Sequence, residues 1–190
     1  MRIQLLSDLH IEANPDLHIL PAAGADLLVL AGDIGSYQIR NDGSRLPAPD
    51  WGLQQFSPLP QYGGWPVPVV YVPGNHEYDA LDFDQAHDDL RRTCDRLGLV
   101  WLEREQWQHG GVRFVGTTLW ADFDALAHGL PGSQALKARA KAFRAANYYL
   151  RTLKTQRAGA LFDAAAMREH SLVCQQWLSE ALEQDRKSTR

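Results

Sequence analysis

The sequence predicts an α/β fold built on parallel strands, and three observations support this prediction. Apolar runs typical of strands occupy residues 2–6, 27–31 and 67–72. Each run ends in a turn that carries carboxylate, imidazole or amide side chains. Helical patterns follow the third run and fill the last third of the chain. In open α/β sheets the carboxyl ends of parallel strands meet at one edge, where ligands bind. We therefore expect a ligand site at that edge.

The segments between these strands follow from their proline content and lack of periodicity. Residues 11–26 are typical of a polar connection, and residues 35–64 contain four of the ten prolines. The second segment is predicted to be an irregular insertion with one short helix near residues 51–56. Long loops inside compact domains are usually functional or mobile. Because this one leaves directly from Asp33, we expect it to cover the substrate and to influence substrate preference.

Periodicity predicts three helices and two more strands. Residues 82–97 form an amphipathic helix, a second helix begins at Ser133, and a third begins near Asp163, a suitable N-cap. The apolar positions of the first two are Phe83, Leu90, Cys94 and Leu97, then Leu136, Phe143 and Leu150. Strands are predicted at residues 100–102 and 112–116, the latter entered through a turn at residues 109–111.

The remaining histidines and the basic helix residues have ordinary structural explanations. His87 is expected on a solvated acidic helix face, His109 in a turn, and His170 in the core. Lys137, Lys141, Arg144 and Arg151 form a basic stripe that could meet phosphate, although a solvated face explains it better.

Length and composition indicate a single domain spanning residues 1–190, with no membrane partner. The 21.3 kDa chain is 45% hydrophobic and 22% charged, and no apolar run has the length of a membrane span. Met1 leads directly into the first strand, which leaves no room for a signal peptide, and Cys94 and Cys174 have no CxxC partner. We therefore expect a cytoplasmic location and reduced cysteines.

Charge is distributed unevenly along the chain. Residues 1–133 carry a net charge of −10 and residues 134–190 a net charge of +6. An acidic first part suits a cation site and, without a dense basic and aromatic patch, argues against nucleic acid as a partner. A small phosphorylated substrate is the expected partner.

The turns after the three strands contain the residues with metal chemistry. Asp8 and His10, two positions apart at a strand end, point to the same side and can hold one ion. Asp33 has two oxygens that can bridge two ions, and Asn75 adds a neutral oxygen ligand. This nitrogen and oxygen set favours two divalent ions of Mn, Fe, Zn or Co. Such a pair would activate a bridging hydroxide for displacement at phosphorus, with His76 beside the leaving oxygen.

The ordered motifs resemble those of the calcineurin-like metallophosphoesterase superfamily. They are Asp8-Leu9-His10, Gly32-Asp33 and Gly74-Asn75-His76-Glu77, with a further similarity at residues 116–120. The resemblance implies a four-layer α/β/β/α sandwich. It also implies Asp8 and His10 on one metal, Asn75 on the other, Asp33 bridging, and a catalytic His76 that is not a ligand. The activity implied is hydrolysis of a phosphomonoester or a phosphodiester.

Two departures from the family pattern change what we expect. The protein phosphatases of the superfamily carry a GDxxDRG motif, whereas residues 32–37 read Gly-Asp-Ile-Gly-Ser-Tyr. The carboxylate that orients the catalytic histidine in that class is therefore missing, and a protein phosphatase is not expected. The later histidine and the GHxH motif of the family also have no counterpart among His18, His87, His109, His128 and His170.

The missing histidine motifs suggest that the domain is truncated before the last strands of its second sheet. Such a truncation would expose an unpaired strand edge, so we expect weak solubility or self-association. The alternative to an enzyme is a non-catalytic phosphoesterase fold that serves as a binding scaffold, or an inactive fragment. A nuclease is a weaker alternative because the first two-thirds of the chain is acidic.

Overall fold

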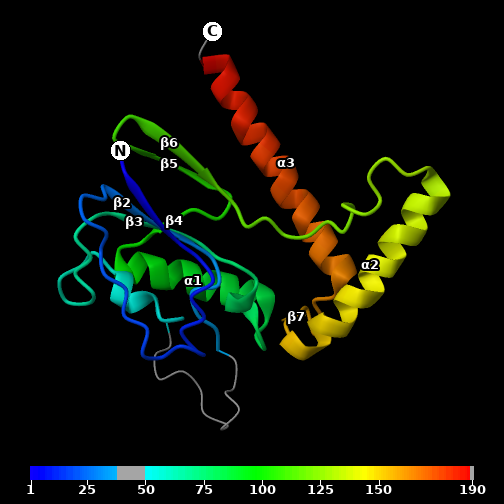
Figure 1. Ribbon diagram of the computed structural model, residues 1–190, viewed down its shortest axis with the longest axis horizontal. Helices are drawn as coiled ribbons and strands as arrows, with labels where there is room; N and C mark the ends of the chain where they lie inside the picture. The colour runs from blue at the N-terminus through cyan, green and yellow to red at the C-terminus, as the bar shows by residue number, and fades with distance from the viewer. Residues whose placement is uncertain (38–49, 189–190) are drawn as a thin grey trace. The chain divides into compact units, whose positions relative to one another are not determined.

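The computed structural model describes residues 1–37 and 50–188 (Figure 1). The chain divides into two compact units, residues 1–118 and residues 119–190. The single domain predicted over residues 1–190 stays a prediction.

The first unit is built on a parallel four-stranded sheet. Its strands are β1 (Ile3–Leu6), β2 (Leu27–Ala31), β3 (Val69–Val72) and β4 (Val100–Trp101), in the order β1-β2-β3-β4. In the register, Leu6 of β1 pairs with Leu30 of β2, and Ala31 pairs with Val72 of β3. All four predicted strands are present, with ends shifted by at most two residues. The α/β class with a parallel sheet is confirmed.

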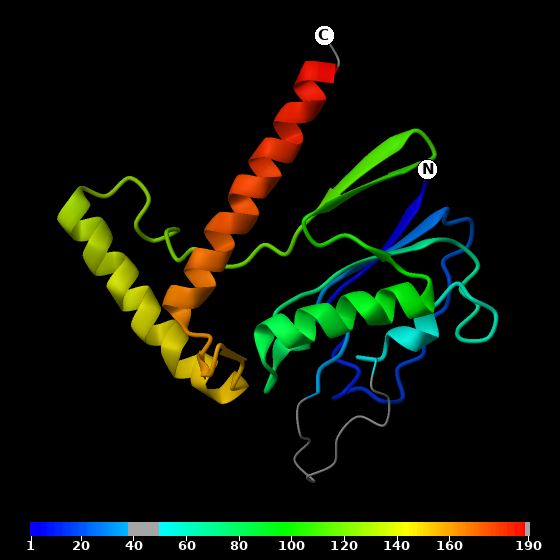
Figure 2. The same ribbon diagram turned by 180° about the vertical axis from the view of Figure 1, so that it is seen from behind.

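Other elements of the first unit lie on both faces of this sheet (Figures 1 and 2). Helix α1 (Phe83–Leu97) lies along one face, and the antiparallel hairpin of β5 (Glu105–His109) and β6 (Val112–Gly116) lies on the other. Leu27 and Val70 point toward the hairpin, where Trp107 and Phe114 pack against their cluster. Because side chains alternate along a strand, Leu28 and Leu30 face α1. The central strands β2 and β3 are therefore largely buried on both sides, which explains their almost continuous apolar runs. In the edge strand β1, Ile3 and Leu5 are 50% and 64% exposed.

Strand β5 is absent from the sequence-based prediction. Its sequence, Glu-Gln-Trp-Gln-His, has one large apolar residue and no β-branched residue, so its alternation was weak evidence for a strand. Pairing with β6 determines its conformation. His109, predicted to be a turn residue, is the last residue of β5, and its ring stacks on Trp107 with centroids 4.7 Å apart. The turn itself consists of Gly110 and Gly111, both with positive φ.

The sequence suggested that His87 lies on a solvated face of its helix, and this prediction is wrong. His87 follows Phe83 by one helical turn, so it shares the buried side of α1. Its Nδ1 is 3.2 Å from the Tyr78 hydroxyl, and its ring meets the edge of Trp101. Burial is the main cause that lowers the pKa of His87. The neighbouring aspartates misled the prediction because Asp84 and Asp88 are exposed, whereas His87 is partly buried.

Two short 3₁₀ helices lie in the loops of the first unit. η1 (Leu53–Phe56) confirms the short helix predicted near residues 51–56, and η2 (His76–Tyr78) follows β3 directly. Within the insertion predicted over residues 35–64, residues 38–49 lie outside the described residues. Its role in substrate preference stays a prediction.

The second unit contains α2 (Gly132–Leu153), the strands β7 (Gln156–Arg157) and β8 (Ala160–Leu161), and α3 (Ala164–Ser188). The predicted N-cap is confirmed, because Asp163 Oδ1 accepts from the backbone N–H of Ala165 and Ala166, each at 3.0 Å. His170 is buried against Trp120 and Phe162, as predicted. Within the described residues, no helix is long and apolar enough to cross a membrane.

The predicted apolar side of α2 is only partly correct. Leu150 is buried, but Leu136 is 64% exposed. The buried positions of α2 lie near its end, at Leu150 and Leu153. Near that end Asn147 Oδ1 accepts from the backbone N–H of Ala164, where α3 begins. The periodicity identified the correct helix but could not show which of its apolar positions are buried.

Candidate metal centre

The turns that follow β1, β2 and β3 lie side by side because the three strands are parallel and in register. Backbone hydrogen bonds join the first two turns: Asp8 N–H donates to Gly32 O and His10 N–H donates to Asp33 O, both at 3.1 Å. The third turn joins them through His76 N–H, which donates to Asp33 Oδ1 at 2.9 Å. Residues far apart in the sequence thus meet at the carboxyl edge of the sheet, as the sequence predicted.

Glu77 holds the second and third turns together. Its fully buried carboxylate accepts from the backbone N–H groups of Asp33 at 3.1 Å, Ile34 at 2.8 Å and Gly74 at 2.8 Å. Burial, followed by the charge of Asp33, raises the pKa of Glu77 to about 7, although the three N–H donors act in the opposite direction. The sequence alone indicated no role for Glu77 beyond membership of the motif.

Two glycines permit the close approach of these turns. A Cβ on Gly32, whose φ is +84°, would lie 2.7 Å from the backbone of Gly74. A Cβ on Gly74 would lie 2.7 Å from Asp33 N and would also collide with the Asp33 carboxylate. A side chain at Gly74 must therefore move Asp33, and a side chain at Gly32 must move the backbone of Gly74.

Gly74→Ala should weaken both the fold and the metal centre. Overpacking costs about 1–3 kcal/mol, and displacement of Asp33 should lower the affinity for Mn²⁺ by about tenfold or more, as loss of a supporting contact does. Thermal unfolding and calorimetric Mn²⁺ titration measure the two effects. Gly132→Ala is the matched control, because a Cβ there has no neighbour within 4 Å. Equal results for the two variants would contradict the role of the close approach.

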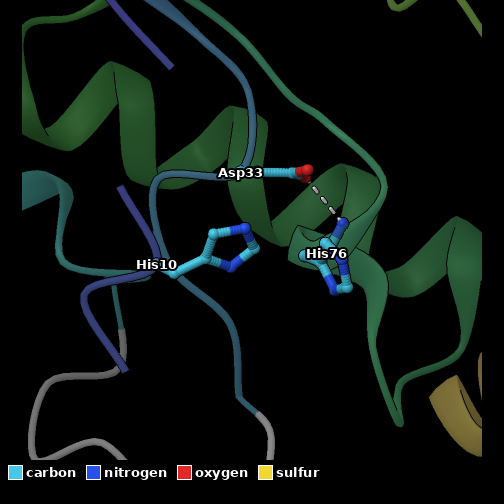
Figure 3. A group of neighbouring side chains, drawn as sticks. All are labelled: His10, Asp33 and His76. Carbon is cyan, nitrogen blue, oxygen red and sulfur yellow. Dashed lines mark hydrogen bonds between the residues drawn. The ribbon is translucent and has the colours of Figure 1, made fainter. Parts of the chain in front are cut away.

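Three side chains of these turns form a potential metal-binding group (Figure 3). One ligand atom from each of His10, Asp33 and His76 lies within 4.8 Å of the other two. The two imidazole rings meet edge to face, with centroids 4.9 Å apart and an interplanar angle of 73°. Two imidazoles and one carboxylate are suitable donors for a divalent transition metal. Of these three, His10 and Asp33 are the predicted ligands, and their nitrogen and oxygen donors suit the kind of ion that the sequence predicted. His76, which is predicted to be catalytic and not a ligand, lies beside them.

The other two predicted ligands are Asp8, which is not part of this group, and Asn75. Asp8 is exposed, and its contribution to the site rests on its backbone bond to Gly32 O. Asn75 is partly buried and precedes η2, where its backbone carbonyl accepts from Tyr78 N–H at 3.3 Å. Their roles as ligands stay predictions.

Asp8, His10 and Asp33 all have left-handed backbone conformations. Their φ values are 54°, 45° and 53°. Such conformations in residues other than glycine are uncommon, cost about 1–3 kcal/mol each, and concentrate at functional sites. The hydrogen bonds between the turns hold these conformations. This feature supports a functional role for the three residues independently of their side-chain chemistry.

Each histidine of the group has a carboxylate at its Nδ1 atom. His10 Nδ1 is 3.0 Å from Glu12 Oε1, and His76 Nδ1 is 2.6 Å from Asp79 Oδ2. The hydrogen bond to Asp79 is the largest cause that raises the pKa of His76, against the effect of burial. Residues 32–37 predicted that the carboxylate that would orient His76 in the protein phosphatase class is missing. A carboxylate does contact His76, but it comes from the residue three positions later.

The sequence contained a signal for this contact. Residues i and i+3 lie on the same side of a 3₁₀ turn, so an Asp three positions after His76 could have been considered. The Glu12 contact has a similar local origin, because Glu12 lies two residues after His10.

Comparison with known proteins gives one family and one relative. The family model described as calcineurin-like phosphoesterase matches residues 1–188. The chain is also similar to an uncharacterized protein, L509, of Acanthamoeba polyphaga mimivirus, with 30% identity over 60 residues. That match covers 28% of this chain and 21% of the relative, so the chain spans about a fifth of the relative's length there.

Proposed function

The chain belongs to the calcineurin-like phosphoesterase family, and from this membership we propose that it hydrolyses a phosphate ester with a divalent metal held by His10 and Asp33. The observation that carries the proposal is the convergence of His10, Asp33 and His76 at one sheet edge. A bound divalent ion would supply Lewis-acid stabilisation and lower the pKa of water. If two ions bind, Asp8, His10, Asp33 and Asn75 would be the residues that hold them, which is part of the same proposal.

The residues of this site have distinct roles in the proposed reaction. Asp33 and His10 would hold the ion. The Nε2 atom of His76 donates a proton to the leaving oxygen, and the carboxylate at Nδ1 favours the protonated imidazole that this step requires. The raised pKa of His76 supports this role, because a general acid must hold its proton near neutral pH. The substrate is proposed to be a small phosphorylated molecule, and the location to be cytoplasmic.

Removal and return of metal test the proposal directly. Chelator-treated chain should not hydrolyse bis(p-nitrophenyl) phosphate or p-nitrophenyl phosphate, and added Mn²⁺ should restore hydrolysis of at least one. Elemental analysis after removal of free Mn²⁺ counts the bound ions. Metal binding without hydrolysis of either ester would favour the alternative function, a non-catalytic scaffold. Hydrolysis that is insensitive to metal would contradict the proposed site.

A further inference from the structure

The two histidines of the metal centre are held in the same way by carboxylates from different loops. Glu12 lies in the connection after β1, and Asp79 follows η2. The Nδ1 to oxygen distances are 3.0 Å for His10 and 2.6 Å for His76, both within hydrogen-bonding range. Each ring therefore presents its Nδ1 atom to a carboxylate.

Both carboxylates are themselves fixed in place. The other oxygen of Glu12, Oε2, accepts from the backbone N–H of Ser36 at 3.0 Å, which ties Glu12 to the loop after Asp33. The Asp79 side chain is fully buried, and its backbone N–H donates to His76 O at 3.2 Å. Glu12 cannot turn away without breaking its hydrogen bond with Ser36 N–H. Asp79 cannot turn away without leaving its buried position. They are consequently suited to hold the rings in one orientation.

The chemistry of a carboxylate determines which ring nitrogen carries the proton. An ionised carboxylate only accepts hydrogen bonds, so the Nδ1 atom facing it must carry hydrogen. A neutral imidazole then has its lone pair on Nε2, which is the form that binds a metal. Carboxylate partners of this kind typically contribute 10–100-fold to metal affinity. For a histidine that donates a proton, the same partner stabilises the imidazolium.

We propose that Glu12 and Asp79 are positioning residues that keep His10 and His76 as Nδ1–H tautomers, with both Nε2 atoms directed to the site of Asp33. The assignment of His10 to metal binding and of His76 to proton donation rests on the proposed function. The assignment of their tautomers does not. Glu12 acts through a metal-binding ring, and Asp79 acts through a proton-donating ring. Loss of the Glu12 carboxylate should therefore weaken metal binding, and loss of the Asp79 carboxylate should lower kcat.

The tautomers can be measured in the metal-free chain, independently of activity. With ¹⁵N-labelled histidine at alkaline pH, long-range ¹H–¹⁵N spectra should show protonated Nδ1 and unprotonated Nε2 for His10 and His76. Glu12→Ala should shift His10 toward the Nε2–H tautomer, and Asp79→Ala should do the same for His76. If a variant fails to fold, Glu12→Gln and Asp79→Asn, which keep one acceptor oxygen, should show a partial shift. Nε2–H tautomers in the wild-type chain would overturn the proposal.

Metal affinity and kinetics then separate the two residues. Glu12→Ala should weaken Mn²⁺ binding by about 10–100-fold. Asp79→Ala should leave Mn²⁺ affinity within a few fold of wild type and lower kcat by about tenfold or more, with KM unchanged. Asp16→Asn and Asp88→Asn are controls, since both are exposed aspartates outside the site. Glu12 and Asp79 variants that both bind Mn²⁺ and turn over like these controls would overturn the proposal.

The positioning roles of Glu12 and Asp79 can be tested even if the wild-type chain is inactive. If the chain hydrolyses neither ester, the proposed function fails, whereas the tautomer spectra and the Mn²⁺ affinity of Glu12→Ala still decide the positioning roles. Conversely, an active enzyme with the wrong tautomers would reject the positioning roles alone.

Discussion

Asp33→Asn and His76→Ala should each lower kcat/KM for hydrolysis of bis(p-nitrophenyl) phosphate by about 10²–10⁴-fold, the range that a general acid contributes. The reasons differ. Asn at position 33 keeps an oxygen that can accept from His76 N–H, so the turn survives, but it loses the charge that holds the metal. His76→Ala removes the proton donor and leaves the proposed ligands Asp33 and His10 in place.

Metal content distinguishes these two losses. After reconstitution with Mn²⁺, elemental analysis should find less metal bound to Asp33→Asn and an unchanged amount bound to His76→Ala. His18→Ala is a suitable control for the second variant, because His18 is exposed in the connection of residues 11–26. Loss of metal from His76→Ala would instead make His76 a ligand, and wild-type rates for both variants would refute the mechanism.

Glu77→Ala should reduce the free energy of unfolding of the metal-free chain by about 3 kcal/mol or more. Three backbone N–H groups lose their acceptor, that of Ile34 buried and those of Asp33 and Gly74 partly buried, and an unsatisfied buried group costs about 1–3 kcal/mol. Urea unfolding followed by circular dichroism measures the change. Glu105→Ala is the control, because Glu105 is an acidic residue whose ion pair with Arg91 is largely solvent-exposed. A similar small loss in both variants would show that Glu77 does not hold the turns.

The stability of the metal-free chain should also depend on pH through Glu77. Its pKa is raised from 4.5 to about 7 in the folded state, so the folded state holds this proton more tightly than the unfolded state. The resulting stability is fully present below pH 4.5 and is lost as the pH rises through about 7, which amounts to roughly 2–3 kcal/mol between pH 5 and pH 8. Glu77→Gln removes this titration, so the difference between the wild-type and Gln pH profiles isolates it. Parallel profiles would contradict the raised pKa.

Local sequence patterns predicted most of the first unit. Strand β2 was predicted to the residue because a parallel strand buried on both faces is apolar at nearly every position. Helix α1 followed from its amphipathic period. Strand β5 was missed because its polar sequence becomes a strand only through pairing with β6, and His87 was misplaced because its acidic neighbours outweighed its distance from Phe83.

The order of residues along the chain was enough to indicate which chemistry gathers at the sheet edge. Asp8, His10, Asp33, Asn75 and His76 each stand shortly after a strand, so strand prediction and residue type were sufficient to nominate them. The family resemblance, later supported by the match over residues 1–188, came from the same residues.

The way in which that edge is held together depends on tertiary contacts. Glu77 reaches Asp33 and Ile34 across more than forty positions of sequence, and this contact depends on the parallel register of β2 and β3. The convergence of His10, Asp33 and His76 likewise depends on turns that approach closely through Gly32 and Gly74. Local patterns specify where a strand ends and which residues form the next turn. They do not specify the separation of two turns from different strands, because that distance is determined by packing over the whole unit.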